Sequence, residues 1–149
     1  MSGSATLEAL YQEQILEHYR RPRGKGTLPA ADATATVRNP LCGEEATVSV
    51  ALDRTGEEVR VRDIRFTGDG CSLSQASASM MTELVRGRTA SEIAALTERF
   101  TALLHGDPVA AQDEQLGPLR AFLAMSRVPA RIPCALLAWS ALGTAIASP

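Results

Sequence analysis

Three cysteines are the residues of this 149-residue chain best suited to metal binding or nucleophilic chemistry. Cys42 lies in the turn-like segment NPLCGE, Cys71 follows the segment TGDG, and Cys134 follows an Ile-Pro pair. None of them lies in the middle of an apolar run, where an inert core cysteine is usually found. Their positions at chain turns make all three candidates for metal ligands or nucleophiles.

Two of these cysteines lie next to predicted helix starts. Ser72 and Gln75 form the Ser-x-x-Gln pattern of a capping box, which places Cys71 just outside the first turn. Pro133 suits the first position of a helix and so places Cys134 within its first turn. The N–H groups and positive dipole end of a helix stabilise a thiolate over a thiol. Both cysteines are therefore predicted to ionise readily. The thiolate is the form of cysteine that binds metals and attacks sulfur.

A carboxylate lies close to the first cysteine. Gly43 separates Cys42 from Glu44 and is predicted to let both side chains point at one ion. Further along the chain, Gly68 and Gly70 are predicted to let a strand turn sharply into a helix. Three thiolates and one carboxylate match the four-coordinate preference of zinc, but thiolate-rich sites also hold iron–sulfur clusters. The wide gaps between the cysteines match no recognised ligand spacing, so small buried cysteines remain an open alternative.

Periodicity along the chain predicts the elements that position these residues. Apolar residues recur at helical intervals over 6–19, 72–85, 91–105 and 116–125, and in a last helix from 130 or 133 to about 146. Strand-like runs cover 34–38, 46–52 and 59–66. Residues 1–149 are therefore expected to form a single α+β domain, a three-stranded antiparallel sheet packed by about five helices. Within it, Ser74, Ser77 and Ser79 are interpreted as small residues that permit close helix packing, and Trp139 as a core anchor.

Composition excludes several classes of function. The net charge of −2 and the pI near 5.7 argue against a nucleic-acid-binding protein. The sequence has no run of about 18 apolar residues, so no membrane span is expected. The N-terminus lacks the basic and apolar regions of a signal peptide, which predicts a cytoplasmic protein with reduced thiols.

Taken together, these segments resemble the IscU/NifU-like scaffold family over nearly the whole chain, and its SufU branch above all. The long stretch between Cys71 and Cys134 resembles a SufU-type helical insertion, and Pro133 stands where IscU-type scaffolds have a histidine. The matching segments are LY (10–11), HY (18–19), PRGKG (22–26), NPLCG (39–43), GDGCS (68–72), SQASASMM (74–81) and PARIPCA (129–135).

The resemblance implies a zinc ion held by Cys42, Glu44, Cys71 and Cys134. It further implies that Cys42 accepts sulfur from a PLP-dependent SufS-type cysteine desulfurase, for delivery to a downstream Suf assembly scaffold. Arg131 is expected near the site, where its charge offsets the excess negative charge of four anionic ligands. The family normally has aspartate where this chain has Glu44, so the loop must adapt to one extra methylene group. Alternatives are a scaffold that binds iron or an iron–sulfur cluster on the same ligands, and a purely structural zinc domain.

Overall fold

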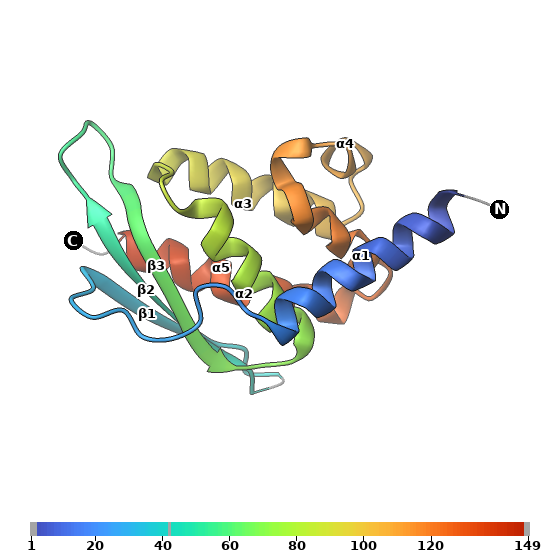
Figure 1. The fold of residues 1–149 in the computed structure, drawn as a ribbon, viewed down its shortest axis with the longest axis horizontal. Helices are drawn as coiled ribbons and strands as arrows, with labels where there is room; N and C mark the ends of the chain where they lie inside the picture. Colours follow the sequence, from blue (N-terminus) through green and yellow to red (C-terminus); the bar gives the residue numbers. More distant parts are fainter. Residues whose placement is uncertain (1–2, 42, 148–149) are drawn as a thin grey trace.

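The computed structural model describes residues 3–41 and 43–147 and confirms the α+β fold predicted from the sequence. A three-stranded antiparallel sheet is covered by helices (Figure 1). In chain order the elements are α1 (Gly3–Arg20), β1 (Ala33–Arg38), β2 (Glu45–Asp53), β3 (Arg60–Asp69), α2 (Ser72–Val85), α3 (Ala90–Leu104), α4 (Pro108–Ala111), the 3₁₀ helices η1 (Glu114–Arg127) and η2 (Pro129–Arg131), and α5 (Ile132–Ala147).

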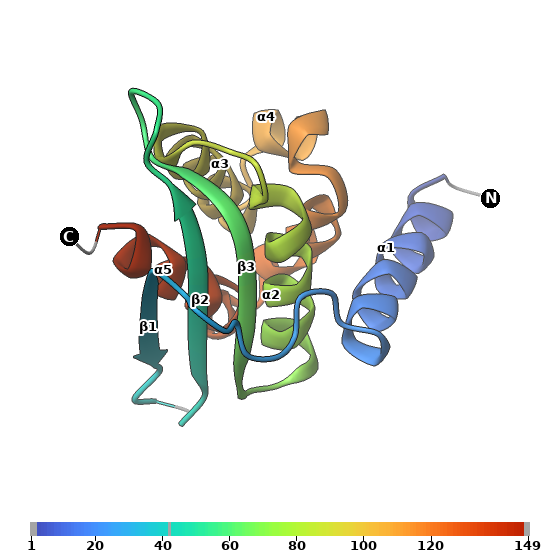
Figure 2. The ribbon, with the colours of Figure 1, turned by 60° about the vertical axis from the view of Figure 1, so that its left-hand side comes forward.

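The sheet has the simple order β1-β2-β3, and both strand pairs are antiparallel. Because side chains alternate between the two faces of a strand, Val48 and Val50 on β2 and Ile64 and Phe66 on β3 point to one side and are fully buried. Helix α5 packs against β1 and β2, and α2 packs along β3, on the same side of the sheet (Figure 2).

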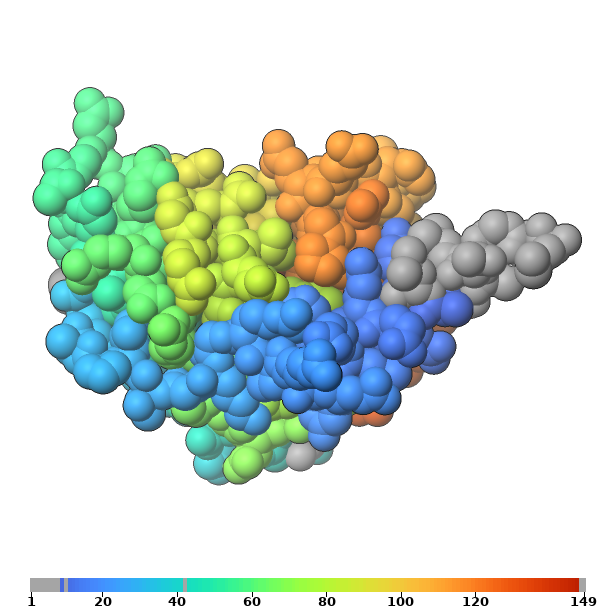
Figure 3. Space-filling model, in the orientation of Figure 1, coloured from blue at the N-terminus to red at the C-terminus, as the bar shows by residue number. Residues whose placement is uncertain are grey.

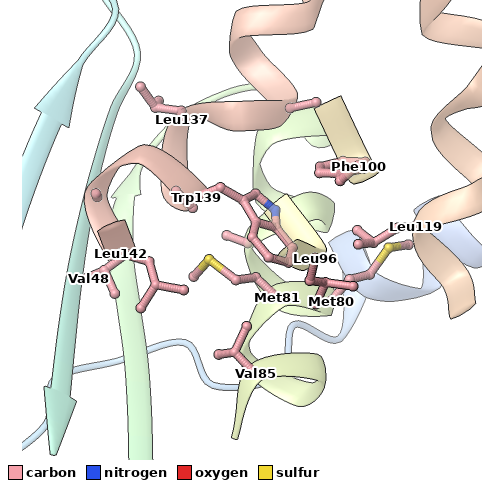
Figure 4. Close-up of a cluster of buried hydrophobic side chains, with 14 of the residues drawn as sticks. Val48, Met80, Met81, Val85, Leu96, Phe100, Leu119, Leu137, Trp139 and Leu142 are labelled. Atoms are coloured by element: carbon pink, nitrogen blue, oxygen red, sulfur yellow. The ribbon is translucent and has the colours of Figure 1, made fainter. Parts of the chain in front are cut away.

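Trp139 of α5 lies at the centre of the core between the sheet-side residues and α3 (Figure 4). Its ring centroid is 5.5 Å from that of Phe100, which makes an edge-to-face contact with Phe122 at 5.8 Å. Met80 and Met81 of α2 are fully buried beside it. The interpretation of Trp139 as a core anchor is confirmed.

The segment Pro129–Ala147 is long and apolar enough, by length and composition alone, to cross a membrane. Half of it is buried inside the fold, where α5 contacts β1, β2 and α2. Its hydrophobicity is therefore that of a core helix.

The region predicted as a helix over 116–125 is instead part of the 3₁₀ helix η1. Gly117 interrupts η1 with a φ of 52° and is followed by Pro118. A proline cannot donate a backbone hydrogen bond and disfavours helical geometry in the residue before it, so regular α-helix does not continue through this pair.

Two connections lie at the same end of the sheet, the one between β1 and β2 and the one between β3 and α2 (Figures 1 and 2). The β2–β3 hairpin lies at the opposite end. On one face of the molecule, the chain from the second half of α1 to β1 forms a continuous band (Figure 3). The connections that carry Glu44 and Cys71 therefore lie at the same end of the sheet.

Candidate metal centre

Three of the four predicted ligands come together in space. Three donor atoms, one each from Glu44, Cys71 and Cys134, lie within 4.8 Å of one another. Glu44 and Cys134 are buried and Cys71 is half-buried, and the two cysteines are not joined in a disulfide. The fourth predicted ligand, Cys42, lies outside the described residues.

Each residue of this cluster lies in a different kind of local structure. Glu44 ends the β1–β2 connection, Cys71 is the N-cap of α2, and Cys134 lies in the first turn of α5. The predicted placement of both cysteines at helix starts is confirmed.

Asn39 organises the loop that presents Glu44. Its side-chain oxygen accepts the Leu41 N–H at 3.1 Å, and its backbone carbonyl accepts the Gly43 N–H at 2.9 Å. Its own N–H donates to the carbonyl of Glu44 at 2.8 Å. Gly43 has a φ of 72°, a left-handed conformation that glycine adopts without steric cost. The loop is thereby closed just before β2 begins.

The start of α2 is capped by Glu44, from a distant segment, and the predicted Ser72–Gln75 capping box is wrong. The backbone N–H of Cys71 donates to Glu44 Oε1 at 2.6 Å, while the side-chain amide of Gln75 donates to the Gly68 carbonyl at 3.4 Å. A carboxylate is a strong acceptor and is favoured at the positive end of a helix, so it takes the place of a local cap.

Ser74 connects these groups. Its hydroxyl donates to the carbonyl of Cys71 at 3.0 Å and lies 3.5 Å from Glu44 Oε1. A side chain at Gly70 would collide with the Ser74 hydroxyl and approach Glu44 Oε1 to 3.4 Å. Gly70 therefore leaves room for these two side chains.

Gly68 differs from its predicted role in a strand-to-helix turn. It lies inside β3 with a φ of 147°, paired with Ala46. A Cβ atom there would collide with the backbone of Glu45. The residue permits a close approach of β2 and β3 beside the cluster.

The serines of α2 do more than permit close packing. Ser77 donates to the carbonyl of Ala135 at 2.6 Å and accepts from Trp139 Nε1 at 3.1 Å. Ser79 accepts the Arg23 N–H at 2.7 Å and hydrogen-bonds His18 Nδ1 at 2.7 Å. The signal in the sequence was a row of hydroxyls among the small and apolar residues of α2. Polar groups that become buried require hydrogen-bond partners.

Arg131 lies in η2 and is exposed, three residues before Cys134. Its expected role in offsetting the charge of the cluster stays a prediction.

The donor set fits a tetrahedral thiolate-rich metal site. Around a common zinc ion with Zn–S bonds of about 2.3 Å, neighbouring donor atoms lie roughly 3.8 Å apart. The separations in the cluster, none above 4.8 Å, need only a small contraction to reach that geometry. Two thiols and a carboxylate also suit iron, so the cluster is a candidate metal site without a choice of metal.

Comparison with known proteins supports a role in iron–sulfur cluster assembly. The chain is 37% identical, over 99% of its length and 96% of the relative, to the zinc-dependent sulfurtransferase SufU of Bacillus subtilis. It is also 37% identical, over 94% of its length and 84% of the relative, to the iron–sulfur cluster assembly scaffold protein IscU of Streptococcus pyogenes.

A solved structure shares the fold. It is that of a candidate iron–sulfur cluster assembly scaffold protein for the SUF system from Fervidobacterium islandicum, with a TM-score of 0.76 and 29% identity over 93% of this chain and 98% of the other. The family model of the NifU-like N-terminal domain matches residues 10–148. The chain therefore belongs to the NifU-like N-terminal domain family of iron–sulfur cluster assembly proteins, as the sequence motifs predicted.

Proposed function

We propose that the protein is a zinc-dependent sulfur acceptor that serves a PLP-dependent, SufS-type cysteine desulfurase. The observation that carries the proposal is the gathering of Glu44, Cys71 and Cys134 around one point, where a thiolate-rich metal site fits. The likeness to a relative named as a zinc-dependent sulfurtransferase, across almost the whole chain, supports zinc and sulfur transfer together.

Cys42, Glu44, Cys71 and Cys134 would hold the zinc, which keeps thiolates ionised and the site ordered. The Glu44 carboxylate has two oxygens, so one accepts the Cys71 N–H while the other serves the metal. Arg131, in η2 just before α5, would offset part of the negative charge.

The transfer step is a thiolate–persulfide exchange. The Cys42 thiolate attacks the outer sulfur of a persulfide on the desulfurase cysteine, so one S–S bond forms as another breaks. The desulfurase cysteine leaves as a thiolate, the outer sulfur stays on Cys42 as a persulfide, and no net oxidation or reduction occurs. The outer sulfur of this persulfide is then passed on to a downstream Suf assembly scaffold in the cytoplasm.

The decisive experiment combines the protein with its cognate desulfurase, PLP and cysteine, and measures alanine formation. The parent protein is expected to accelerate turnover because it removes the persulfide that blocks the desulfurase. Cys42→Ala is expected to abolish this acceleration. The acceptor mechanism is wrong if the parent gives no acceleration, or if Cys42→Ala accelerates turnover equally well.

A second candidate function is an iron–sulfur cluster scaffold that uses the same ligands. The equal identity to the Streptococcus pyogenes IscU scaffold favours it. Purification without added iron separates the two functions. Colourless protein with one zinc per chain supports the sulfur acceptor, and brown protein with visible absorption supports the scaffold.

A further inference from the structure

We propose that Ser77 is a positioning residue that sets the gap between the two thiol-bearing helices, and with it the metal affinity of the site. The inference rests on the metal site proposed above and extends it to a residue outside the ligand set. Cys71 and Cys134 come from α2 and α5, whose relative position must be held for their thiols to meet at one ion.

Ser77 joins these two helices by a pair of hydrogen bonds. Its hydroxyl donates to the carbonyl of Ala135, the residue directly after Cys134, at 2.6 Å. It also accepts the indole N–H of Trp139, at the next turn of α5, at 3.1 Å. Both contacts are buried, and Ser77 itself is fully buried. One hydroxyl therefore fixes the first turns of α5 against α2.

The two hydrogen bonds of Ser77 affect the positions of both thiols because helices transmit displacement along their axes. Cys71 caps the N-terminal end of the helix that carries Ser77, and Cys134 is the chain neighbour of the carbonyl that Ser77 binds. A shift of α5 relative to α2 changes the separation of the two sulfur atoms directly. Residues that orient metal ligands typically change metal affinity by about 10- to 100-fold when they are replaced.

The same helix offers a matched control in Ser79. Its hydroxyl is fully buried and has two partners, His18 Nδ1 and the Arg23 N–H, each at 2.7 Å. Those partners belong to α1 and the segment that follows it, and not to α5. Removing either hydroxyl leaves polar partners without their bond and destabilises the fold by a similar amount. Only Ser77→Ala removes hydrogen bonds to α5, the helix that carries Cys134.

The first test uses Co²⁺ as the probe, because its thiolate charge-transfer and d–d absorption report the ligands and their geometry. Ser77→Ala is expected to weaken Co²⁺ binding about tenfold, measured by competition with a chelator, and to reduce the charge-transfer intensity. Ser79→Ala is expected to keep the parent spectrum and affinity. The assignment is overturned if Ser77→Ala keeps both, or if the two variants weaken binding equally.

A metal-free readout separates this inference from the proposed function. In a Cys42→Ala background, phenylarsine oxide bridges the remaining two thiols, and its affinity reports their separation. Ser77→Ala is expected to weaken this binding about tenfold and Ser79→Ala to leave it unchanged. If the parent protein binds neither Zn²⁺ nor Co²⁺, the proposed function is wrong. If the Cys42→Ala protein and its Ser77→Ala and Ser79→Ala derivatives bind phenylarsine oxide with equal affinity, the role of Ser77 is wrong.

If Ser77→Ala does not fold, Ser77→Thr carries the same test. It keeps the hydroxyl but adds a methyl group to a fully buried contact, and this overpacking is expected to disturb the packing of α5 against α2. Weaker Co²⁺ and arsenical binding by Ser77→Thr supports the assignment, and parent-like binding of both probes overturns it.

Discussion

Among single residues, Glu44 shows how one carboxylate serves two structural demands. Its Oε1 accepts the N–H at the start of α2, and the carboxylate lies within 4.8 Å of the thiols of Cys71 and Cys134. Only 9% of the residue is exposed, so its negative charge is placed in a site where the helix terminus and a metal cation would stabilise it. The two roles respond differently to substitution.

Glu44→Gln is expected to weaken zinc binding by at least about tenfold while the metal-free fold loses less than about 1 kcal/mol. Glutamine keeps an oxygen that accepts the Cys71 N–H but loses the anionic ligand. Glu44→Ala removes both the accepting oxygen and the anionic group. It is also expected to lower the unfolding free energy of the metal-free protein by about 1–2 kcal/mol. Chelator competition and urea unfolding measure the two effects. Parent-like zinc affinity in Glu44→Gln would exclude the carboxylate as a ligand.

Leu41 is a large apolar residue that is 93% exposed, immediately before the proposed acceptor Cys42. Burying such a side chain in a partner contributes about 1.5–3 kcal/mol. Leu41→Ser is therefore expected to raise the protein concentration that half-maximally stimulates the desulfurase by about tenfold, with zinc affinity unchanged.

Val109 on α4 provides the control for that measurement, because it is also aliphatic and is 77% exposed. Val109→Ser is expected to leave the protein concentration that half-maximally stimulates the desulfurase unchanged. Equal curves for Leu41→Ser and the parent would show that Leu41 makes no contact with the desulfurase.

Between elements, α1 is joined to α2 through a buried histidine. His18 Nδ1 hydrogen-bonds Ser79, and His18 Nε2 lies 3.7 Å from Glu83 of α2. Burial is the main cause that lowers the pKa of His18 below 6.5, and the nearby Arg23 guanidinium lowers it further. Glu83 and Glu17 oppose this shift without cancelling it. The folded protein therefore favours neutral His18.

The depressed pKa predicts that stability falls in mild acid. The unfolded chain takes up a proton at His18 near pH 6.5, whereas the folded chain resists it until a lower pH. The stability tied to neutral His18 is thus fully present above pH 6.5 and is lost as the pH falls toward the folded pKa. Urea unfolding from pH 7.5 to 5.5 is expected to show this decline in the parent and a smaller one in His18→Asn. Identical pH profiles would contradict it.

For the whole molecule, the candidate site ties together segments that are distant in the chain. Glu44 ends the β1–β2 connection, Cys71 is the N-cap of α2, and Cys134 lies in the first turn of the core helix α5. A ligand that binds only the folded arrangement stabilises it by mass action. Metal binding is therefore expected to act on global stability as well as on the reaction.

Zinc at a hundredfold excess over its dissociation constant is expected to add about 2.7 kcal/mol to the unfolding free energy. For a chain of this size that corresponds to a Tm increase of about 5–10 °C over the chelator-treated protein. Cys71→Ala, which removes one of the proposed ligands, is expected to lose most of the increase. Calorimetry with zinc and with chelator measures it, and superimposable parent transitions would refute a site that binds zinc in the folded state.

Local patterns were sufficient for most of the elements. The range 72–85 predicted for α2 matches the structure, and the strand runs were placed to within a few residues, with β3 continuing to Asp69. Placement of Cys71 and Cys134 at helix starts was likewise predicted from proline, glycine and serine near them. These features depend on periodicity and backbone preferences of neighbouring residues, which the sequence contains directly.

Contacts across the fold were decided only by the tertiary structure. No local pattern indicates that Glu44 caps α2, that Gly70 leaves space for Ser74, or that Ser77 binds the carbonyl beside Cys134. A side-chain carboxylate or hydroxyl can bond to many partners, and which one it meets depends on how sheet and helices pack. The sequence by itself determined most of the elements and the donor types. The packing of α2, α5 and the β1–β2 connection determined that three donors meet.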